Sequence, residues 1–258
     1  MSGLRLALRQ LRYEDLAFRR NPAKAFFTVV FPIIFLVIFT MMFGNDDLEV
    51  EGGTVKVATF YVAAIVALTV VNSCYTGLAM SFAIARDQGL LKRVRGTPLP
   101  PWSFVLARVI HLTLVMLVLA VLVVAFGRIF YDVTLPTTTL PAVLITLIVG
   151  AAAFSALGIA VVAVIPNADA APAVVNASVL PLLFISDVFI PPDTATPEWI
   201  QWVADVFPIR HLSEALQTGF NPFETGAGFE WFNLAVIAAW GIGGLVLALR
   251  FTSWEPRV

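Results

Sequence analysis

RDQGLLKRVRGTPLPPW, residues Arg86–Trp102, is a basic island between two long apolar runs. The run before it, Val57–Ala85, and the run after it, Ile110–Gly127, contain no Asp, Glu, Lys or Arg. Each reaches the ~18 apolar residues that indicate a membrane-spanning helix. We therefore expect the island to be a short connection between two spans, held at a membrane surface.

Residues 90–95 of the island have the spacing of a short amphipathic helix lying along that surface. Leu90, Leu91 and Val94 fall at i, i+1 and i+4, so they are expected on one side of the helix. The cationic side chains gather on the other side: Lys92, Arg93 and Arg95. Helix-breaking residues follow and should turn the chain back into the bilayer: Gly96, Pro98, Pro100 and Pro101. A basic loop that merely obeys membrane topology would explain the charges but not the apolar spacing.

The island resembles the segment between the second and third spans of ABC-2 type transporter permeases, the membrane subunits of ATP-driven exporters. The family pattern reads acid-Arg-acid-x-Gly-Thr-Leu, followed by a basic stretch that ends in Arg-x-Thr-Pro. The residues that match it are Arg86, Asp87, Gly89, Leu91, Arg95, Thr97 and Pro98. Ala85 stands in place of the first acid, and Leu90 stands in place of the first threonine.

The composition also indicates a membrane protein. Hydrophobic residues make up 59% of the chain and charged residues 13%, whereas soluble domains average roughly 45–50% and 25%. The apolar runs predict an all-α polytopic membrane protein, a single domain over residues 1–258, with six transmembrane helices at 25–43, 57–85, 103–126, 140–165, 170–187 and 231–250. The single cysteine, Cys74, excludes an internal disulfide framework.

Residues 1–24 are expected to form a helix that lies in the membrane interface. Arg5, Arg9 and Arg12 recur at helical spacing. One position earlier, leucines recur in the same way: Leu4, Leu8 and Leu11. A secretory signal peptide is the competing interpretation. We reject it because the apolar run that follows is too long and no small-residue cleavage site comes after it.

Two segments outside the spans are expected on the opposite side of the membrane. Residues 44–56 predict an acidic loop, and residues 190–230 predict short external re-entrant helices. Helically spaced apolar residues mark the first of these helices: Trp199, Trp202, Val203 and Val206. The second begins at Phe207 and ends at Gly219. A similar stretch of short external helices follows the fifth span of ABC-2 permeases.

The distribution of basic residues along the chain predicts its orientation. Most of them lie in the N-terminal segment, the island and the C-terminal tail: Arg5, Arg9, Arg12, Arg19, Arg20, Lys24, Arg86, Lys92, Arg93, Arg95, Arg250 and Arg257. The opposite loops hold Lys56, Arg128 and Arg210. The positive-inside rule then places both termini and the island in the cytoplasm, in a multi-pass protein of the plasma membrane.

Polar residues near the middle of the second span leave two interpretations open. They are Asn72, Ser73, Tyr75 and Thr76. Such residues either hydrogen-bond to neighbouring helices, which contributes about 0.6 kcal/mol on average, or line a cavity. His111 and Asp187, near span ends, are either transport residues or ordinary boundary residues.

The motifs of the common hydrolases are absent from the sequence. Without GxxxxGK[ST] the chain has no P-loop for ATP, and HExxH, GxSxG and CxxC are missing as well. We therefore expect no catalytic residue, and no metal or cofactor bound by this chain. A secondary transporter driven by an ion gradient is the main alternative function, and a membrane enzyme is another. A secondary transporter would need ionisable residues deep in the bundle, and a membrane enzyme would need paired catalytic residues.

The resemblance implies a permease dimer, homodimeric or heterodimeric, that carries two ABC ATPase subunits, which would bind the ATP and magnesium. The island would dock into the ATPase and couple to its motion through Arg86, Asp87, Gly89, Leu90, Leu91, Lys92, Arg93, Arg95, Thr97 and Pro98. The resemblance also implies a substrate path at the dimer interface, for which the candidates are Asn72, Tyr75, Asn176 and Phe184. Similarity to drug-resistance permeases of the daunorubicin type implies a hydrophobic or amphiphilic cargo. The expected partners are these subunits and the lipid bilayer, and not nucleic acid.

Overall fold

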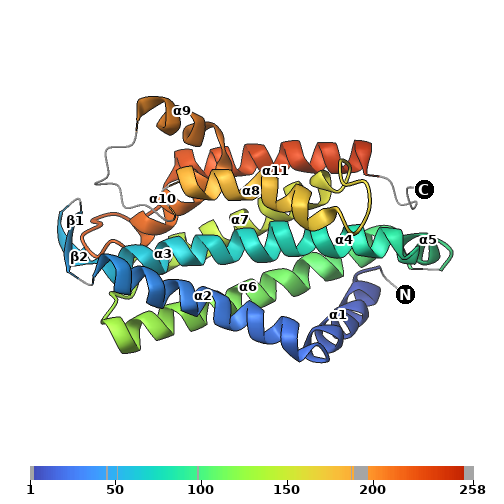
Figure 1. Ribbon diagram of the computed structural model, residues 1–258, viewed down its shortest axis with the longest axis horizontal. Helices are drawn as coiled ribbons and strands as arrows, with labels where there is room; N and C mark the ends of the chain where they lie inside the picture. Colours follow the sequence, from blue (N-terminus) through green and yellow to red (C-terminus); the bar gives the residue numbers. More distant parts are fainter. Residues whose placement is uncertain are drawn as a thin grey trace.

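The chain folds into an elongated bundle of long helices (Figure 1). A computed structural model describes residues 3–44, 46–50, 52–97, 99–186, 188 and 197–252. Within them, five helices are long and apolar enough to cross a membrane: Ala25–Phe43, Val57–Asp87, Pro101–Tyr131, Leu140–Val161 and Trp231–Phe251. The prediction of an all-α polytopic membrane protein is therefore confirmed.

The second of these helices, which we call the central rod, forms the core of the bundle. It consists of α3 (Val57–Val70), η1 (Val71–Gly77) and α4 (Leu78–Asp87), joined end to end. Every residue of α3 is buried, and Figure 1 shows the rod running along the middle of the molecule. A helix that is apolar on all sides needs an apolar environment all round. Here the other helices provide much of that environment.

Three of the other long helices pack against the rod: α2 (Pro22–Phe43), α6 (Pro101–Tyr131) and α7 (Leu140–Val161). The fourth, α11 (Trp231–Phe251), packs on α7 instead. α6 continues to Tyr131, beyond the predicted end of the span at 126, so Arg128 lies in a helix rather than in a loop. Small residues bring α7 and α11 together, because a Cβ on Gly241 would lie only 2.8 Å from the Cα of Ala153. Close backbone approach of this kind is how membrane helices commonly associate.

α8 (Ala171–Ile185) is an apolar helix too short to meet the same criterion. Its 15 residues rise about 22 Å, less than the ~30 Å thickness of a bilayer's hydrocarbon core. The predicted span continues to residue 187, and Asp187 lies outside the described residues. The fifth predicted span, 170–187, and with it the total of six, therefore stays a prediction.

The segment expected to be an acidic loop contains a β-hairpin instead. β1 (Asp47–Val50) pairs antiparallel with β2 (Gly53–Lys56). Leu48 and Val55 face each other in this register and both are buried. Alternation of apolar and polar residues is typical of a half-buried strand. The four carboxylates of the segment obscure that alternation in the sequence.

Two helices follow the undescribed residues 189–196. α9 (Glu198–Val206) and α10 (Pro208–Phe220) begin close to the predicted positions. α10 is not a surface helix, because it packs against α3, α7 and α11 and buries Leu212 and Leu216 fully. α9 keeps its aromatic side chains exposed, so only one of the two helices has the exposed character that the sequence suggests.

α1 (Gly3–Arg19) is fastened to α6 by a largely buried ion pair. Arg108 Nε lies 3.4 Å from the Glu14 carboxylate, and the two side chains are only 12% and 15% exposed. The Arg108 guanidinium also lies 4.9 Å from the centre of the Phe104 ring. Ser103 Oγ donates a hydrogen bond to the Gly3 carbonyl oxygen at the start of α1. These contacts fix α1 along the end of the bundle that also carries α5 (Leu90–Arg95) (Figure 1).

We expect Glu14→Gln to loosen α1 and to lower the free energy of unfolding by about 1–3 kcal/mol, because Arg108 would be left without its countercharge. Limited proteolysis within α1 and thermal unfolding in detergent measure the two effects. Asp132→Asn is the matched control, since it removes an ion pair with Arg128 in which Asp132 is 85% exposed. Such pairs contribute at most about 1 kcal/mol. Equal effects of the two substitutions would show that the Glu14 pair does not hold α1.

Candidate functional site

The basic island forms a short helix between two turns, as the sequence predicts. α4 ends at Asp87, a turn through Gly89 follows, and α5 (Leu90–Arg95) comes next. Gly89 has a φ of 67°, in the left-handed region that favours glycine, and it therefore sets the corner between α4 and α5. Gly96 caps the end of α5, and Pro101 occupies the first turn of α6.

α5 buries one side and exposes the other. Leu91 and Val94 are buried, whereas Lys92 and Arg93 are exposed. The prediction that Leu90 shares the buried side is wrong, since this residue is 36% exposed. Leu90 is the first residue after the turn and lies at the edge of the apolar side. The outer surface of α5 therefore combines cationic side chains with one leucine.

Other residues of the island have more local roles or lie outside the description. Thr97 is exposed, and its hydroxyl donates a hydrogen bond of 2.7 Å to the Val94 carbonyl oxygen, which closes the last turn of α5. Pro98 and the side chain of Arg95 lie outside the described parts of the structure. Their participation in coupling stays a prediction.

Arg86 points into the bundle and is completely buried. Its guanidinium donates hydrogen bonds to the carbonyl oxygens of Val162 at 3.0 Å, Ile165 at 2.8 Å and Pro166 at 3.2 Å. These carbonyls follow the end of α7, where backbone acceptors lack partners within the helix and the helix dipole favours a cation. Arg86 therefore joins the end of the central rod to the end of α7.

Asp87 extends the same connection to the start of α8. Its Oδ2 accepts a hydrogen bond from the backbone N–H of Ala168, and its Oδ1 lies 3.4 Å from Arg86 Nε. Ala168 belongs to the turn between α7 and α8 (Ala171–Ile185). We call Arg86 and Asp87, with the carbonyls and N–H that they bind, the corner clamp. Through it the corner before α5 is tied to the α7–α8 turn.

The four residues expected along a substrate path do not meet within one chain. Asn72 lines a cavity on the side of the rod that faces α2 and α6, whereas the Tyr75 hydroxyl lies 2.7 Å from Ser178 Oγ of α8. Asn176 and Phe184 are exposed on α8. Their joint role in a path between two chains stays a prediction.

The middle of the rod, η1 (Val71–Gly77), is a π-helix rather than the continuous α-helix expected of this span. Its turns are wider than those of an α-helix, so Asn72 and Tyr75, three residues apart, reach different neighbours. Gly158 of α7 packs directly on this segment, because a Cβ there would lie 2.7 Å from the Tyr75 carbonyl oxygen. π-Helical turns occur often at functional sites. The local sequence signal is a run of polar residues within an apolar span.

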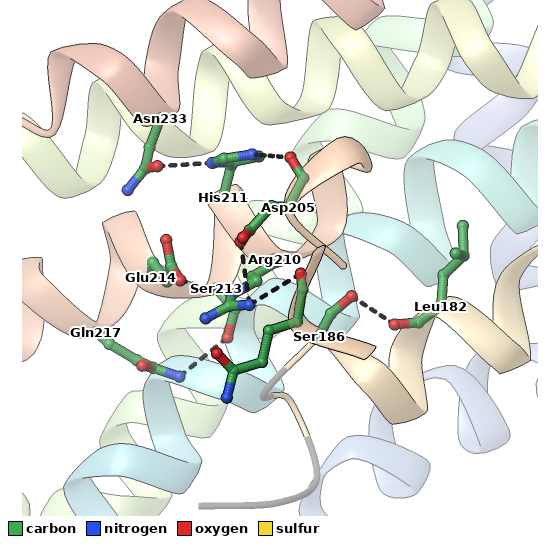
Figure 2. A network of polar contacts seen from close by, with 10 residues as sticks. Leu182, Ser186, Asp205, Arg210, His211, Ser213, Glu214, Gln217 and Asn233 are labelled. Atoms are coloured by element: carbon green, nitrogen blue, oxygen red, sulfur yellow. Dashed lines mark hydrogen bonds and ion pairs between the residues drawn. The ribbon is translucent and has the colours of Figure 1, made fainter. Parts of the chain in front are cut away.

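A second polar network, in the part of the bundle away from α5 (Figure 1), joins α9, α10 and α11 (Figure 2). Arg210 lies 3.0 Å from the Asp205 carboxylate and 2.8 Å from that of Glu214. His211 Nε2 donates to the Asp205 carbonyl oxygen at 2.8 Å, and its Nδ1 lies 2.7 Å from Asn233 Oδ1. The network holds α9 on α10 and α10 against α11. No local spacing in the sequence relates Asn233 to His211, so this network could not be predicted from the sequence.

Known proteins resemble this chain over most of its length. A family model described as ABC-2 type transporter matches residues 8–221. The chain is also similar to a daunorubicin resistance ABC transporter permease protein from Streptomyces coeruleorubidus. The two are 28% identical over 211 residues, which cover 78% of this chain and 69% of the relative. The family match includes the island, the central rod and α10.

Proposed function

The chain belongs to the ABC-2 type transporter family, and on that premise we propose that it is the permease subunit of an ATP-driven exporter. We propose a hydrophobic or amphiphilic substrate, such as a drug, an antibiotic or a lipid-like product, moved out of the cytoplasm or the inner leaflet. The drug-resistance permease to which the chain is similar supports this class of substrate. The apolar composition of the bundle supports it as well.

The energy for transport comes, in this proposal, from ABC ATPase subunits. Two of them bind ATP and magnesium on the cytoplasmic side of a permease dimer, which we propose to be a homodimer. Both termini of the chain and α5 face that side, in the plasma membrane. The excess of basic residues in these segments supports the orientation.

The corner clamp is the observation that best supports coupling between the ATPase and the spans. α5 exposes Lys92 and Arg93 to a partner, and on the other side of the Gly89 corner Arg86 and Asp87 bind the α7–α8 turn. When a partner displaces one of several packed helices, the helices can move together as a rigid body. A displacement of α5 would therefore be passed to the rod, to α7 and to α8 together.

We expect the double charge reversal Lys92→Glu and Arg93→Glu to uncouple the transporter. Two cationic side chains on a docking helix become anionic, which replaces attraction to an acidic groove with repulsion. Co-purification of the permease with candidate ATPases, and ATP hydrolysis stimulated by the permease, should fall at least about tenfold. Thermal stability should stay unchanged, because both side chains are exposed.

The matched control for this experiment is Arg5→Glu with Arg9→Glu. These two side chains are also exposed cations, on α1 at the same end of the bundle. We expect the control to retain the ATPase. If both double variants lose it equally, binding depends on overall charge and not on α5. If the wild type purifies without any ATPase and transports under an ion gradient, the exporter proposal is wrong.

A further inference from the structure

The corner between α9 and α10 lies near the middle of two long apolar helices. A Cβ on Gly150, the eleventh residue of α7, would lie 2.9 Å from Leu212 Cδ1 of α10. Trp240, the tenth residue of α11, donates a hydrogen bond of 2.8 Å from its Nε1 to the Val206 carbonyl oxygen. Both α7 and α11 are long and apolar enough to cross a membrane. The corner therefore lies within the depth of the bilayer and not on its surface.

From this corner α10 runs to the end of the bundle that carries the β-hairpin (Figure 1). A Cβ on Gly219 would lie 2.6 Å from Val143 Cγ2, and Val143 is only the fourth residue of α7. Asn221, directly after α10, lines a pocket of about 330 Å³ together with Glu49 of the hairpin. The 13 residues of α10 rise about 20 Å, enough to join the middle of a ~30 Å hydrocarbon core to its surface.

Every residue of α10 that is not buried is polar. These residues, which we call the polar side of α10, are Arg210, Glu214, Gln217 and Thr218. Their spacing places them on one side of the helix, from the corner to its outer end (Figure 2). α11 differs, because its exposed residues between Ala235 and Leu249 are all apolar. An apolar surface suits lipid, whereas the polar side of α10 does not.

The inner end of the polar side carries the ion pairs of Arg210 with Asp205 and Glu214. The Arg210 side chain is only 17% exposed, but those of Asp205 and Glu214 are 55% and 36% exposed. Ionisable side chains at membrane depth are costly unless they face the interior of the bundle or a water-filled cavity. Carboxylates that stay this exposed at the depth of the corner therefore indicate contact with water.

We infer that a water-filled vestibule runs along the polar side of α10, from the pocket beside the hairpin down to the corner. The vestibule favours cations, because at the corner two carboxylates face one guanidinium and Glu49 adds a third carboxylate at the mouth. This inference goes beyond the proposed function. It rests on the insertion of the helices in a membrane and needs neither an ATPase nor a particular cargo.

The test measures the reaction of single cysteines with charged reagents that do not cross membranes. The one native cysteine, Cys74, is completely buried, so the wild-type chain is the blank. Gln217→Cys and Glu214→Cys are treated in sealed vesicles, from each side in turn, with the cationic reagent MTSET or the anionic reagent MTSES. We expect both cysteines to react from the same side as Thr54→Cys, which is exposed on the hairpin.

The matched control is Ala239→Cys. This position is exposed, next to Trp240 and thus at the depth of the corner, but it lies on the apolar surface of α11. We expect it to react at least about ten times more slowly than Gln217→Cys, because charged reagents do not enter lipid. Size-exclusion chromatography checks that each variant is folded. Gln217→Cys keeps both ion pairs of Arg210, so it remains a valid probe if Glu214→Cys is unstable.

The two reagents also report the charge of the vestibule. Once their rates are divided by those with free cysteine, MTSET should react about three- to tenfold faster than MTSES at Gln217→Cys. Glu49→Gln should lower this ratio at least about twofold, since it removes a carboxylate at the mouth. Glu198→Gln removes an exposed carboxylate of α9 that does not line the pocket, and we expect it to leave the ratio unchanged.

Two outcomes would overturn the vestibule. The first is reaction at Gln217→Cys and Glu214→Cys no faster than at Ala239→Cys. The second is a Gln217→Cys chain that resists both reagents but forms disulfide-linked dimers on mild oxidation, which would show that the polar side faces a second copy. Equal corrected rates of MTSET and MTSES would overturn the preference for cations.

The proposed function fails separately from this inference. If both cysteines react from the hairpin side but no ATPase drives transport, the vestibule stands and the exporter proposal falls. ATP-driven transport by chains whose two cysteines stay unreactive gives the reverse result.

Discussion

Arg86→Met should lower the free energy of unfolding by about 3–5 kcal/mol, the range for removing one partner from a buried charged contact. The methionine side chain fills a similar space but donates nothing, so three carbonyl oxygens at the end of α7 lose the hydrogen bonds that they now accept. Arg86→Lys should show an intermediate loss, since one ammonium cannot reproduce the fork of a guanidinium. Thermal unfolding, followed by size-exclusion chromatography of the heated protein, measures both.

Arg93→Met is the control for this result, because it makes the same substitution seven residues further along, on α5, at an exposed position. We expect a change of less than about 0.5 kcal/mol there. A second measurement separates stability from coupling. In the folded fraction of Arg86→Lys, stimulated ATP hydrolysis should fall while the ATPase remains bound, because the docking surface is intact and the link to α7 is weakened. Equal stability of Arg86→Met and Arg93→Met would contradict the role of the corner clamp.

Gly158→Val should prevent stable folding, because we expect it to lower the free energy of unfolding by more than about 4 kcal/mol. The first added carbon would lie 2.7 Å from the Tyr75 carbonyl oxygen and 3.0 Å from that of Cys74. Both obstacles are backbone atoms of η1, which cannot rotate out of the way as a side chain can. Even Gly158→Ala should lower the free energy of unfolding by about 1–3 kcal/mol. The yield of monodisperse protein and the temperature of unfolding measure these effects.

Gly243 supplies the matched control within α11. A Cβ at this position meets no atom within 4 Å, so Gly243→Ala should be neutral or stabilise the helix by up to about 1 kcal/mol. The comparison keeps the residue types constant and changes only what surrounds them. If Gly158→Ala behaves like Gly243→Ala, the π-helix and α7 are not in the close contact described.

The long spans are predictable from the sequence because length and apolarity are local properties. Val57–Asp87 and Leu140–Val161 required little more than counting consecutive apolar residues. The length of α8 is harder to judge, because Ser186 and Asp187 interrupt a sequence that is apolar on both sides of them, and no local rule fixes where the helix stops. The insertion of α10 between other helices depends on contacts with α3 and α7, which are distant in sequence.

At the candidate coupling site, too, the sequence predicts local features but not contacts between residues that are distant in the chain. The sequence identifies the island and separates the apolar and cationic sides of α5, because these follow from helical spacing. It cannot distinguish Arg93, which faces outward, from Arg86, which is buried. Both are arginines in one short stretch, and the difference lies in carbonyl groups 76 to 80 residues further along the chain. The cavity beside η1 is hidden for a related reason, since its walls come from separate helices.

The corner clamp also constrains the order in which the protein is assembled during synthesis. Arg86 leaves the ribosome 76 to 80 residues ahead of the carbonyl groups that it binds. Until then its guanidinium lacks the three carbonyl acceptors and has only the neighbouring Asp87 carboxylate, and since burying such a charge in the bilayer is costly, we expect it to stay hydrated at the membrane surface. The central rod can therefore reach its final position across the bilayer only after α7 has been inserted beside it. A nascent chain stopped before Val162 should therefore expose this corner to water at the membrane surface, where chaperones and proteases on that side can recognise it.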